Sequence, residues 1–138
     1  MSTLNRGPEV FNHAHLEVSS EEKELIAVAR RLSDEHFGPR AARHDAENTF
    51  PSENFEQLRR HGLMALTVPK EYGGHGASSL TLAAVTLEIA KGDPATALCF
   101  TMHSTAMTFL RLLATPEQKE RVLTGIVEGN VEAIAMSE

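Results

Sequence analysis

Residues 92–118 carry the sequence GDPATALCFTMHSTAMTFLRLLATPEQ, and this stretch decides the fold class. Gly92 ends one helix, and Asp93-Pro94 begins the next, because aspartate caps a helix N-terminus and proline is tolerated at the first helical position. About twenty residues later, Thr115-Pro116-Glu117-Gln118 repeats this signal as a capping box. Connections this short make neighbouring helices antiparallel, so the stretch predicts an up-and-down helical domain.

Three further helices are predicted upstream of this stretch. The first begins at the capping box Ser19-Ser20-Glu21-Glu22, and its apolar stripe is interrupted at Gly38-Pro39, where proline predicts a kink or a restart. The second begins at Phe50-Pro51-Ser52 and ends at Gly62, which suits a left-handed helix stop. The third runs from a cap at Ser78 or Ser79 to Gly92.

Two connecting segments and the end of the chain complete the expected fold. The apolar run 63–69 ends at proline and is predicted to be an extended connector that crosses the core. Tyr72-Gly73-Gly74-His75-Gly76 lacks the fingerprint of a phosphate cradle and is predicted to be a structural turn with positive φ. The fifth helix should end near Glu128-Gly129, and alternation over 132–137 indicates the start of a strand.

These signals predict an all-α fold of about five helices with a short terminal strand start. The expected divisions are a flexible N-terminal tail over residues 1–18, a helical domain over 19–131, and the first strand of a middle β-domain over 132–138. Most of that β-domain would lie beyond Glu138.

Composition excludes several function classes. The formal net charge of −6, with no basic stripe, argues against nucleic-acid binding. No apolar stretch reaches the roughly 20 residues of a membrane span, and the N-terminus lacks a signal-peptide layout, so a cytoplasmic protein is expected. The single cysteine, Cys99, is expected to be a small buried residue in a reducing compartment. No motif for metal hydrolysis or serine catalysis occurs, and no metal site is predicted.

Several motifs occur in an order that resembles the N-terminal helical domain of the acyl-CoA dehydrogenase family. The resemblance covers roughly residues 20–138. Its densest stretches are Val68-Pro69-x-x-Tyr72-Gly73-Gly74-x-Gly76-x-Ser78, Glu88-x-Ala90-x-x-Asp93, His103, Thr115-x-x-Gln118-Lys119 and Ala135-Met136-Ser137-Glu138. Each piece alone is weak, whereas all of them at family-like spacing make a strong signal.

The resemblance implies a flavoprotein of fatty acid metabolism that oxidises an acyl-CoA thioester to its α,β-enoyl form with FAD, passes the electrons to an acceptor and forms a homo-oligomer when complete. A carboxylate base removes the α-proton while flavin takes the β-hydride. In the family the base belongs to a later domain, so no catalytic residue is expected here. This chain alone is expected to be inactive and to bind no FAD. In the complete enzyme, the Met136 backbone and the Ser137 hydroxyl are the expected flavin contacts.

The resemblance also implies that the helix after Asp93 lines the acyl pocket. Ala97, Leu98, Thr101 and Met102 are the candidate substrate-binding residues, because small or apolar side chains suit a fatty chain. Apolar residues at this spacing also serve simply to pack a core. His103 either lies near the flavin or donates a hydrogen bond to a neighbouring segment, and the structural role is favoured.

Two other readings remain open at this point. A flavin-dependent monooxygenase or oxidase of the same fold would activate oxygen and need no thioester. Some of these enzymes carry polar ring-bearing residues where this chain has Leu98 and Met102, so the apolar side chains favour the dehydrogenase. The second alternative is a standalone, non-catalytic helical binding or assembly module. An unpaired strand start argues against that module, since an exposed strand invites aggregation.

Overall fold

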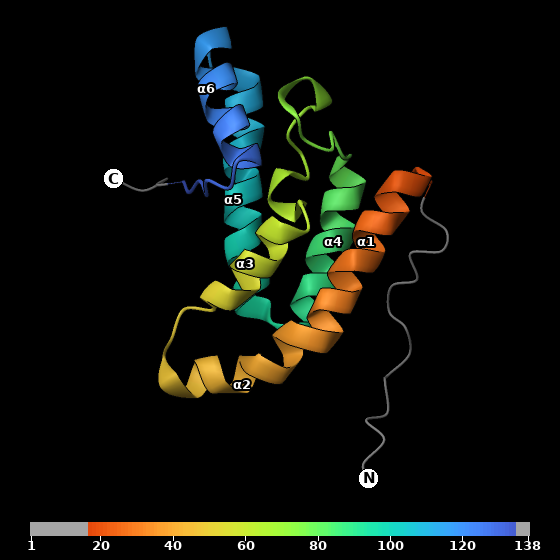
Figure 1. The fold of residues 1–138 in the computed structure, drawn as a ribbon, viewed down its shortest axis with the longest axis vertical. Coiled ribbons are helices and arrows are strands. Elements are labelled where there is room, and N and C mark those ends of the chain that lie inside the picture. The colour runs from red at the N-terminus through yellow and green to blue at the C-terminus, as the bar shows by residue number, and fades with distance from the viewer. Residues whose placement is uncertain (1–16, 135–138) are drawn as a thin grey trace.

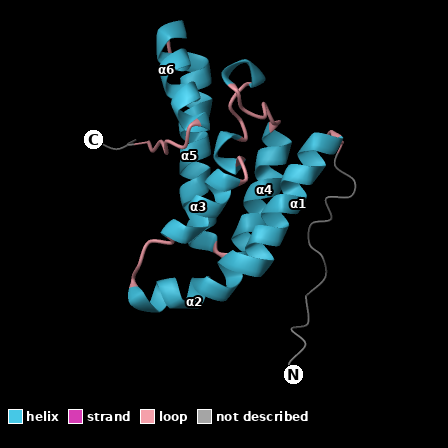
Figure 2. Ribbon diagram, in the orientation of Figure 1, coloured by secondary structure: helices cyan, strands magenta, loops and turns pink. Residues whose placement is uncertain are grey.

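The computed structural model describes residues 17–134, and every regular element in this part is helical (Figures 1 and 2). The α-helices are α1 (Ser20–Leu32), α2 (Gly38–Glu47), α3 (Ser52–Arg60), α4 (Ser79–Gly92), α5 (Pro94–Leu113) and α6 (Pro116–Val127). A π-helical turn, Ser33–Phe37, joins α1 to α2 without a break. The all-α prediction is therefore confirmed, with α1 and α2 forming one bent helical stretch.

The helices begin where the capping signals predict. Ser19 and Glu22 form a reciprocal capping box at α1, and Thr115 and Gln118 form one at α6. The side chain of Asp93 accepts a hydrogen bond from the Ala95 N–H at the start of α5. These bonds satisfy backbone donors that have no partner within the helix, so local sequence fixes the starts of α1, α5 and α6.

The kink expected at Gly38-Pro39 takes the form of the π turn. The Gly38 N–H donates to the Ser33 carbonyl, five residues back, and the proline follows inside the first turn of α2. The widened turn accommodates a residue that lacks an N–H, and α2 turns away from the axis of α1 (Figure 1). A Cβ added to Gly92 would lie 2.4 Å from Ser33 Oγ, so the bend rests closely on the end of α4.

The apolar segment after α3 is buried but not extended, so that prediction is wrong. Leu63–Ala65 forms a 3-10 turn, preceded by Gly62 at φ 73°. The chain then loops back through hydrogen bonds from the His75 N–H to the Ala65 carbonyl and from the Gly76 N–H to the Val68 carbonyl. These bonds return the chain onto the 3-10 turn, which an extended segment would not allow.

The glycine-rich turn has the predicted structural role. Gly73 and Gly76 have φ values of 90° and 61°, a region that glycine enters without steric cost. Gly74 is required for a different reason, because a Cβ there would lie 2.2 Å from the Val68 carbonyl oxygen. Backbone geometry therefore explains the motif without a bound phosphate.

The buried side chains form two clusters. The larger one lies among α1, α3, α4 and the first half of α5, and the smaller one lies among the second half of α5, α6 and the segment after α3, which contributes residues to both. Helix α4 packs against both α1 and α5 (Figure 1). The order of packing thus leaves one side of α5 without a neighbouring helix in the described part of the chain.

The predicted terminal strand is only partly within the described residues. Residues 131–134 follow α6 without regular structure and lie against α5, and residues 135–138 are outside the described range. We call residues 131–134 the exit segment. Among the described helices, none is long and apolar enough to cross a membrane.

Candidate functional site

Helix α5 is apolar on two opposite sides. With about 100° of rotation per residue, Phe100, His103 and Met107 share one side, and all three are buried. The opposite side carries large apolar side chains that are exposed to solvent by 46–77% of their surface: Leu98, Phe109, Leu112 and Leu113. We call this the outer face of α5. A helix that is hydrophobic all round is normally covered on every side, so the outer face is the first candidate for a functional surface.

The predicted acyl-pocket residues divide between the two sides of this helix. Ala97 is 4% exposed and belongs to the larger core cluster, whereas Leu98 is 65% exposed on the outer face. Thr101 and Met102 are half-buried, and the Thr101 hydroxyl donates to the Ala97 carbonyl at 2.8 Å. Leu98 is therefore open to solvent and Met102 partly so, while Ala97 packs the core.

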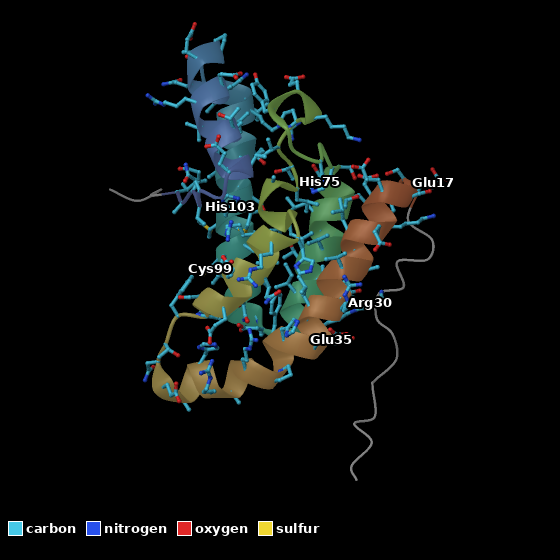
Figure 3. All side chains as sticks on the ribbon, in the orientation of Figure 1. Glu17, Arg30, Glu35, His75, Cys99 and His103 are labelled. Carbon is cyan, nitrogen blue, oxygen red and sulfur yellow. The ribbon has the colours of Figure 1, made fainter. Side chains whose placement is uncertain are left out.

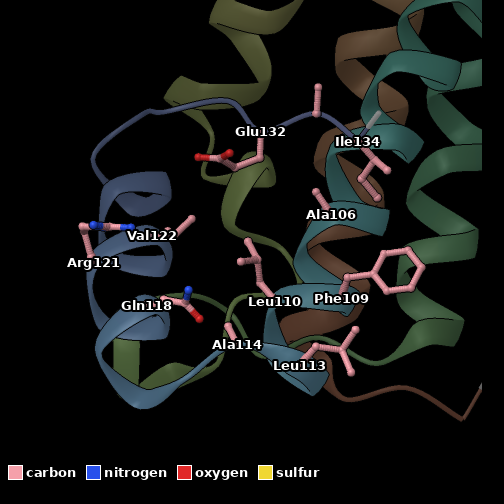
Figure 4. A pocket seen from close by; sticks show the side chains of 11 residues that line it. Ala106, Phe109, Leu110, Leu113, Ala114, Gln118, Arg121, Val122, Glu132 and Ile134 are labelled. Atoms are coloured by element: carbon pink, nitrogen blue, oxygen red, sulfur yellow. The ribbon is translucent and has the colours of Figure 1, made fainter. Parts of the chain in front are cut away.

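A groove of about 550 Å³ opens beside the outer face, between α5, α6 and the exit segment (Figure 4). Its lining is Ala106, Phe109, Leu110, Leu113, Ala114, Gln118, Arg121, Val122, Glu132, Ala133 and Ile134. The α5 side is entirely apolar, and the polar groups come from α6 and from Glu132 at the other edge. The predicted acyl-pocket residues do not line this groove.

The apolar residues that α5 contributes to this groove can be recognised in the sequence. Phe109, Leu110 and Leu113 continue the apolar pattern of Leu98 and Met102 by two further turns. The pattern shows an apolar strip along the whole helix, but the exit segment that closes the groove folds back by a contact that no local motif encodes. A second cavity of similar size lies between α2 and the start of α5, lined by His44, Asp45, Asn48 and Asp93 among others.

His103 has the structural role that was favoured. Its side chain is buried, Nε2 lies 2.8 Å from the Met64 carbonyl oxygen, and Nδ1 accepts the Glu132 N–H at 3.1 Å. Figure 3 labels it on α5, where the exit segment passes. Both ring nitrogens are therefore engaged within the protein.

Two other expectations have different outcomes. Cys99, predicted to be buried, is exposed, because it lies on α5 beside Leu98 and away from the packed side (Figure 3). Met136 and Ser137, the expected flavin contacts, lie outside the described residues. In residues 17–134, no group of three or more His, Cys, Asp or Glu side chains is arranged to hold a metal ion.

The strongest electrostatic contacts lie away from the outer face. The Glu22 carboxylate accepts hydrogen bonds from the Ser19 and Ser78 backbone N–H groups and from the Thr81 hydroxyl. These bonds, led by that from Ser78, hold the pKa of Glu22 well below its usual range. One carboxylate thus ties the first turn of α1 to the start of α4.

Glu88 provides a second link in the same half of the molecule. Its side chain is 1% exposed and lies 3.0 Å from both Arg30 Nη2 and Lys91 Nζ. Burial alone would raise its pKa, but the hydrogen bonds and charges of Arg30 and Lys91 outweigh burial and lower it. By contrast α5, whose residues are all described, contains one charged side chain, Arg111.

Residues 19–130 match the family described as the acyl-CoA dehydrogenase N-terminal domain. The chain belongs to this family. It is 34% identical to the probable acyl-CoA dehydrogenase fadE25 of Mycobacterium leprae over 119 residues, which are 86% of this chain and 31% of that protein. It is also 36% identical to the dibenzothiophene monooxygenase of Rhodococcus erythropolis over 105 residues, 76% of this chain and 25% of that enzyme.

A solved structure, that of the dibenzothiophene monooxygenase TdsC, agrees with the second relationship. The crystal structure of FMN-bound TdsC from Paenibacillus sp. A11-2 matches 76% of this chain and 26% of TdsC, with 30% identity and a TM-score of 0.71. The acyl-CoA dehydrogenase family domain thus has homologues among both acyl-CoA dehydrogenases and flavin monooxygenases. The chain spans 25–31% of the length of these relatives, so it corresponds to one of their domains.

Proposed function

We propose that this chain is the N-terminal domain of an FAD-dependent acyl-CoA dehydrogenase that oxidises an acyl-CoA thioester to its enoyl form. The observation that carries the proposal is the outer face of α5, an apolar surface without a charged side chain that runs along most of the helix. An acyl chain needs such a surface, since burial of each methylene group contributes about 0.8 kcal/mol. The relationship to fadE25 supports the same chemistry.

In this proposal the chain positions the substrate and other domains carry out the chemistry. Leu98 and Met102 form one wall of the acyl slot, and exclude water from it. The flavin, when bound, accepts the hydride. Residues 19–131 form the helical domain, and 132–138 lead into the middle β-domain, where Met136 and Ser137 contact the flavin. The catalytic base belongs to a later domain, and the complete enzyme is a cytoplasmic homo-oligomer.

The second candidate is a flavin-dependent monooxygenase. It is favoured by the 36% identity to dibenzothiophene monooxygenase and by the match to FMN-bound TdsC. The apolar pair Leu98 and Met102 supports the dehydrogenase instead, because an acyl chain makes no use of polar groups at these positions. A standalone helical module is the third candidate. The wide apolar surface on α5 argues against it, since monomeric proteins rarely leave such a surface uncovered.

The test is flavin reduction in the protein expressed from the complete coding region that contains these residues. The dehydrogenase proposal expects bound FAD that acyl-CoA bleaches under anaerobic conditions. A flavin that acyl-CoA leaves oxidised, and that consumes oxygen only after external reduction, would support the monooxygenase. A protein that never binds flavin would contradict both.

A charge placed on the outer face tests the role of α5 in the same protein. Leu98→Glu should weaken acyl-CoA binding by at least about tenfold while FAD is retained, because a carboxylate against an apolar chain is poorly solvated. Ala27→Glu, which adds the same charge at an exposed position of α1, is the matched control and should change little. Equal effects of the two substitutions would remove α5 from the substrate site.

A further inference from the structure

The exit segment is held to α5 through the two nitrogens of one buried side chain. His103 is 1% exposed, with Nε2 at 2.8 Å from the Met64 carbonyl oxygen and Nδ1 at 3.1 Å from the Glu132 amide nitrogen. A carbonyl oxygen only accepts a hydrogen bond and an amide N–H only donates one. The two partners therefore require the neutral ring with its proton on Nε2. We propose that His103 is a positioning residue, which fixes the path of the exit segment by this tautomer.

A second contact makes the position of the segment definite. Ile134 packs against the smaller core cluster, which includes Met107 and Leu123. Glu132 and Ile134 are half-buried, whereas Val131 and Ala133 are exposed. Alternation of this kind places every second residue against the protein. The bond to His103 fixes the segment at residue 132, and the side chain of Ile134 fixes it two residues later.

The exit segment forms one wall of the groove beside the outer face. Glu132, Ala133 and Ile134 belong to its lining, and Figure 4 shows Glu132 and Ile134 along one edge, with α6 on one side and α5 on the other. His103 itself does not line the groove and acts only through this segment. Resting on the proposed function, we infer that the ring sets the width of the groove by holding the exit segment in place.

In this proposal His103 gives α5 a second role, the positioning of the exit segment, and takes no part in the chemistry. The buried side of the helix supplies the His103 ring, which holds the exit segment, and the outer face supplies Phe109 and Leu113, so α5 contributes to two sides of the groove. A residue that only fills space at position 103 would need neither nitrogen. That difference separates a positioning role from a packing role.

The direct test is nitrogen-15 NMR of the 138-residue chain. Ring correlations should show a proton on Nε2 and none on Nδ1, and a scalar coupling should connect the Glu132 amide nitrogen with His103 Nδ1. This measurement needs no substitution and no flavin. A ring protonated on Nδ1, or a Glu132 amide without the coupling, would overturn the proposal.

Two substitutions separate the two nitrogens. His103→Asn places a carboxamide oxygen near the position of Nδ1 and keeps the acceptor for Glu132, whereas His103→Gln places a donor near Nε2 and keeps only the bond to Met64. Hydrogen exchange at the Glu132 amide should stay within about twofold of wild type in His103→Asn. It should accelerate about fivefold to tenfold in His103→Gln, the loss expected for one hydrogen bond.

A packing role makes the opposite prediction, because glutamine is closer to histidine in volume than asparagine is. If His103→Gln protects the Glu132 amide better than His103→Asn, the ring is a space-filling group and the proposal fails. Should one variant not fold, the wild-type coupling still decides the matter. Failure here leaves the flavin test untouched, and failure of the flavin test leaves these exchange rates unchanged, so the two outcomes are distinguishable.

Discussion

The two halves of this domain, α1 to α4 and α5 to α6, differ in the side chains that their main helices expose to solvent. In the first half, α1 buries Leu25 and Leu32 and turns charged residues such as Lys23 and Glu24 to solvent. In the second half, α5 buries Phe100 and exposes Leu112 on the opposite side. Helix α1 therefore has the surface of a helix with one side in water, whereas α5 has the composition of a core helix that is left partly uncovered.

This difference singles out the outer face of α5 as a surface that the described part of the chain leaves uncovered. Polar links such as that of Glu22 join elements within the first half, and the outer face of α5 has no equivalent in the described residues. Because burial of exposed apolar area is a main source of association free energy, we propose the outer face of α5 as the surface that a ligand or another domain covers.

The largest expected effect contrasts the two sides of α5. Phe100→Ala should lower the free energy of unfolding by about 3–5 kcal/mol, because it empties a fully buried site. Phe109→Ala, nine residues along on the exposed side, should change it by no more than about 0.5 kcal/mol. Urea unfolding measures both. Equal losses would mean that the outer face is already covered in the free chain.

A smaller effect contrasts glycines in the two halves. Gly92→Ala should destabilise by about 1–3 kcal/mol, because the new methyl group would meet Ser33 Oγ at 2.4 Å and the Gly38 nitrogen at 3.0 Å. In Gly125→Ala the nearest atom is the end of the Asn130 side chain, which can move, and alanine favours the helix by about 1 kcal/mol. Thermal unfolding should therefore separate the two variants, and a similar Tm for both would contradict the close contact at the bend.

The smallest effect is a dependence on pH carried by Glu22. Its pKa is depressed in the folded state, first by the Ser78 N–H, so its stabilising effect is present above the pKa of the unfolded chain and is lost as the pH falls below about 4. Glu22→Gln keeps the shape and should cost about 1 kcal/mol at pH 7, and this difference should shrink steadily as the pH falls below about 4. If the free energies of unfolding of the variant and the wild type differed by the same amount at every pH, this prediction would be wrong.

Glu117→Gln serves as the control in the second half. Glu117 lies at the exposed start of α6, and its pKa is lowered mainly by a hydrogen bond from its own backbone N–H. Because Glu117 joins no two helices, the free energy of unfolding of Glu117→Gln at acidic pH should stay closer to the wild-type value than that of Glu22→Gln.

Sequence patterns predicted the helices well because their ends depend on local chemistry. Ser19, Asp93 and Thr115 each cap the helix that follows, and each bond joins residues two or three positions apart. The π turn before Pro39 was predicted only as a kink, since the choice of turn depends on how the bend packs against Gly92.

The site was harder to predict because it depends on contacts between distant residues. The family resemblance predicted that α5 lines an acyl pocket and assigned Ala97 and Leu98 to the same surface, but Ala97 is buried and Leu98 is exposed. The error over Cys99 has the same cause, since a helix that is apolar all round gives no sign of which side is buried. The contact between His103 and Glu132 spans 29 residues, beyond the reach of any local motif.

The central claim is that this domain belongs to an enzyme that oxidises acyl-CoA, with α5 against the substrate. The most direct test is the anaerobic absorbance spectrum of the protein from the complete coding region, recorded before and after addition of a saturated acyl-CoA. The account predicts an FAD spectrum that bleaches in the wild type and bleaches only at much higher acyl-CoA concentration in Leu98→Glu. A flavin spectrum that acyl-CoA leaves unchanged would contradict it.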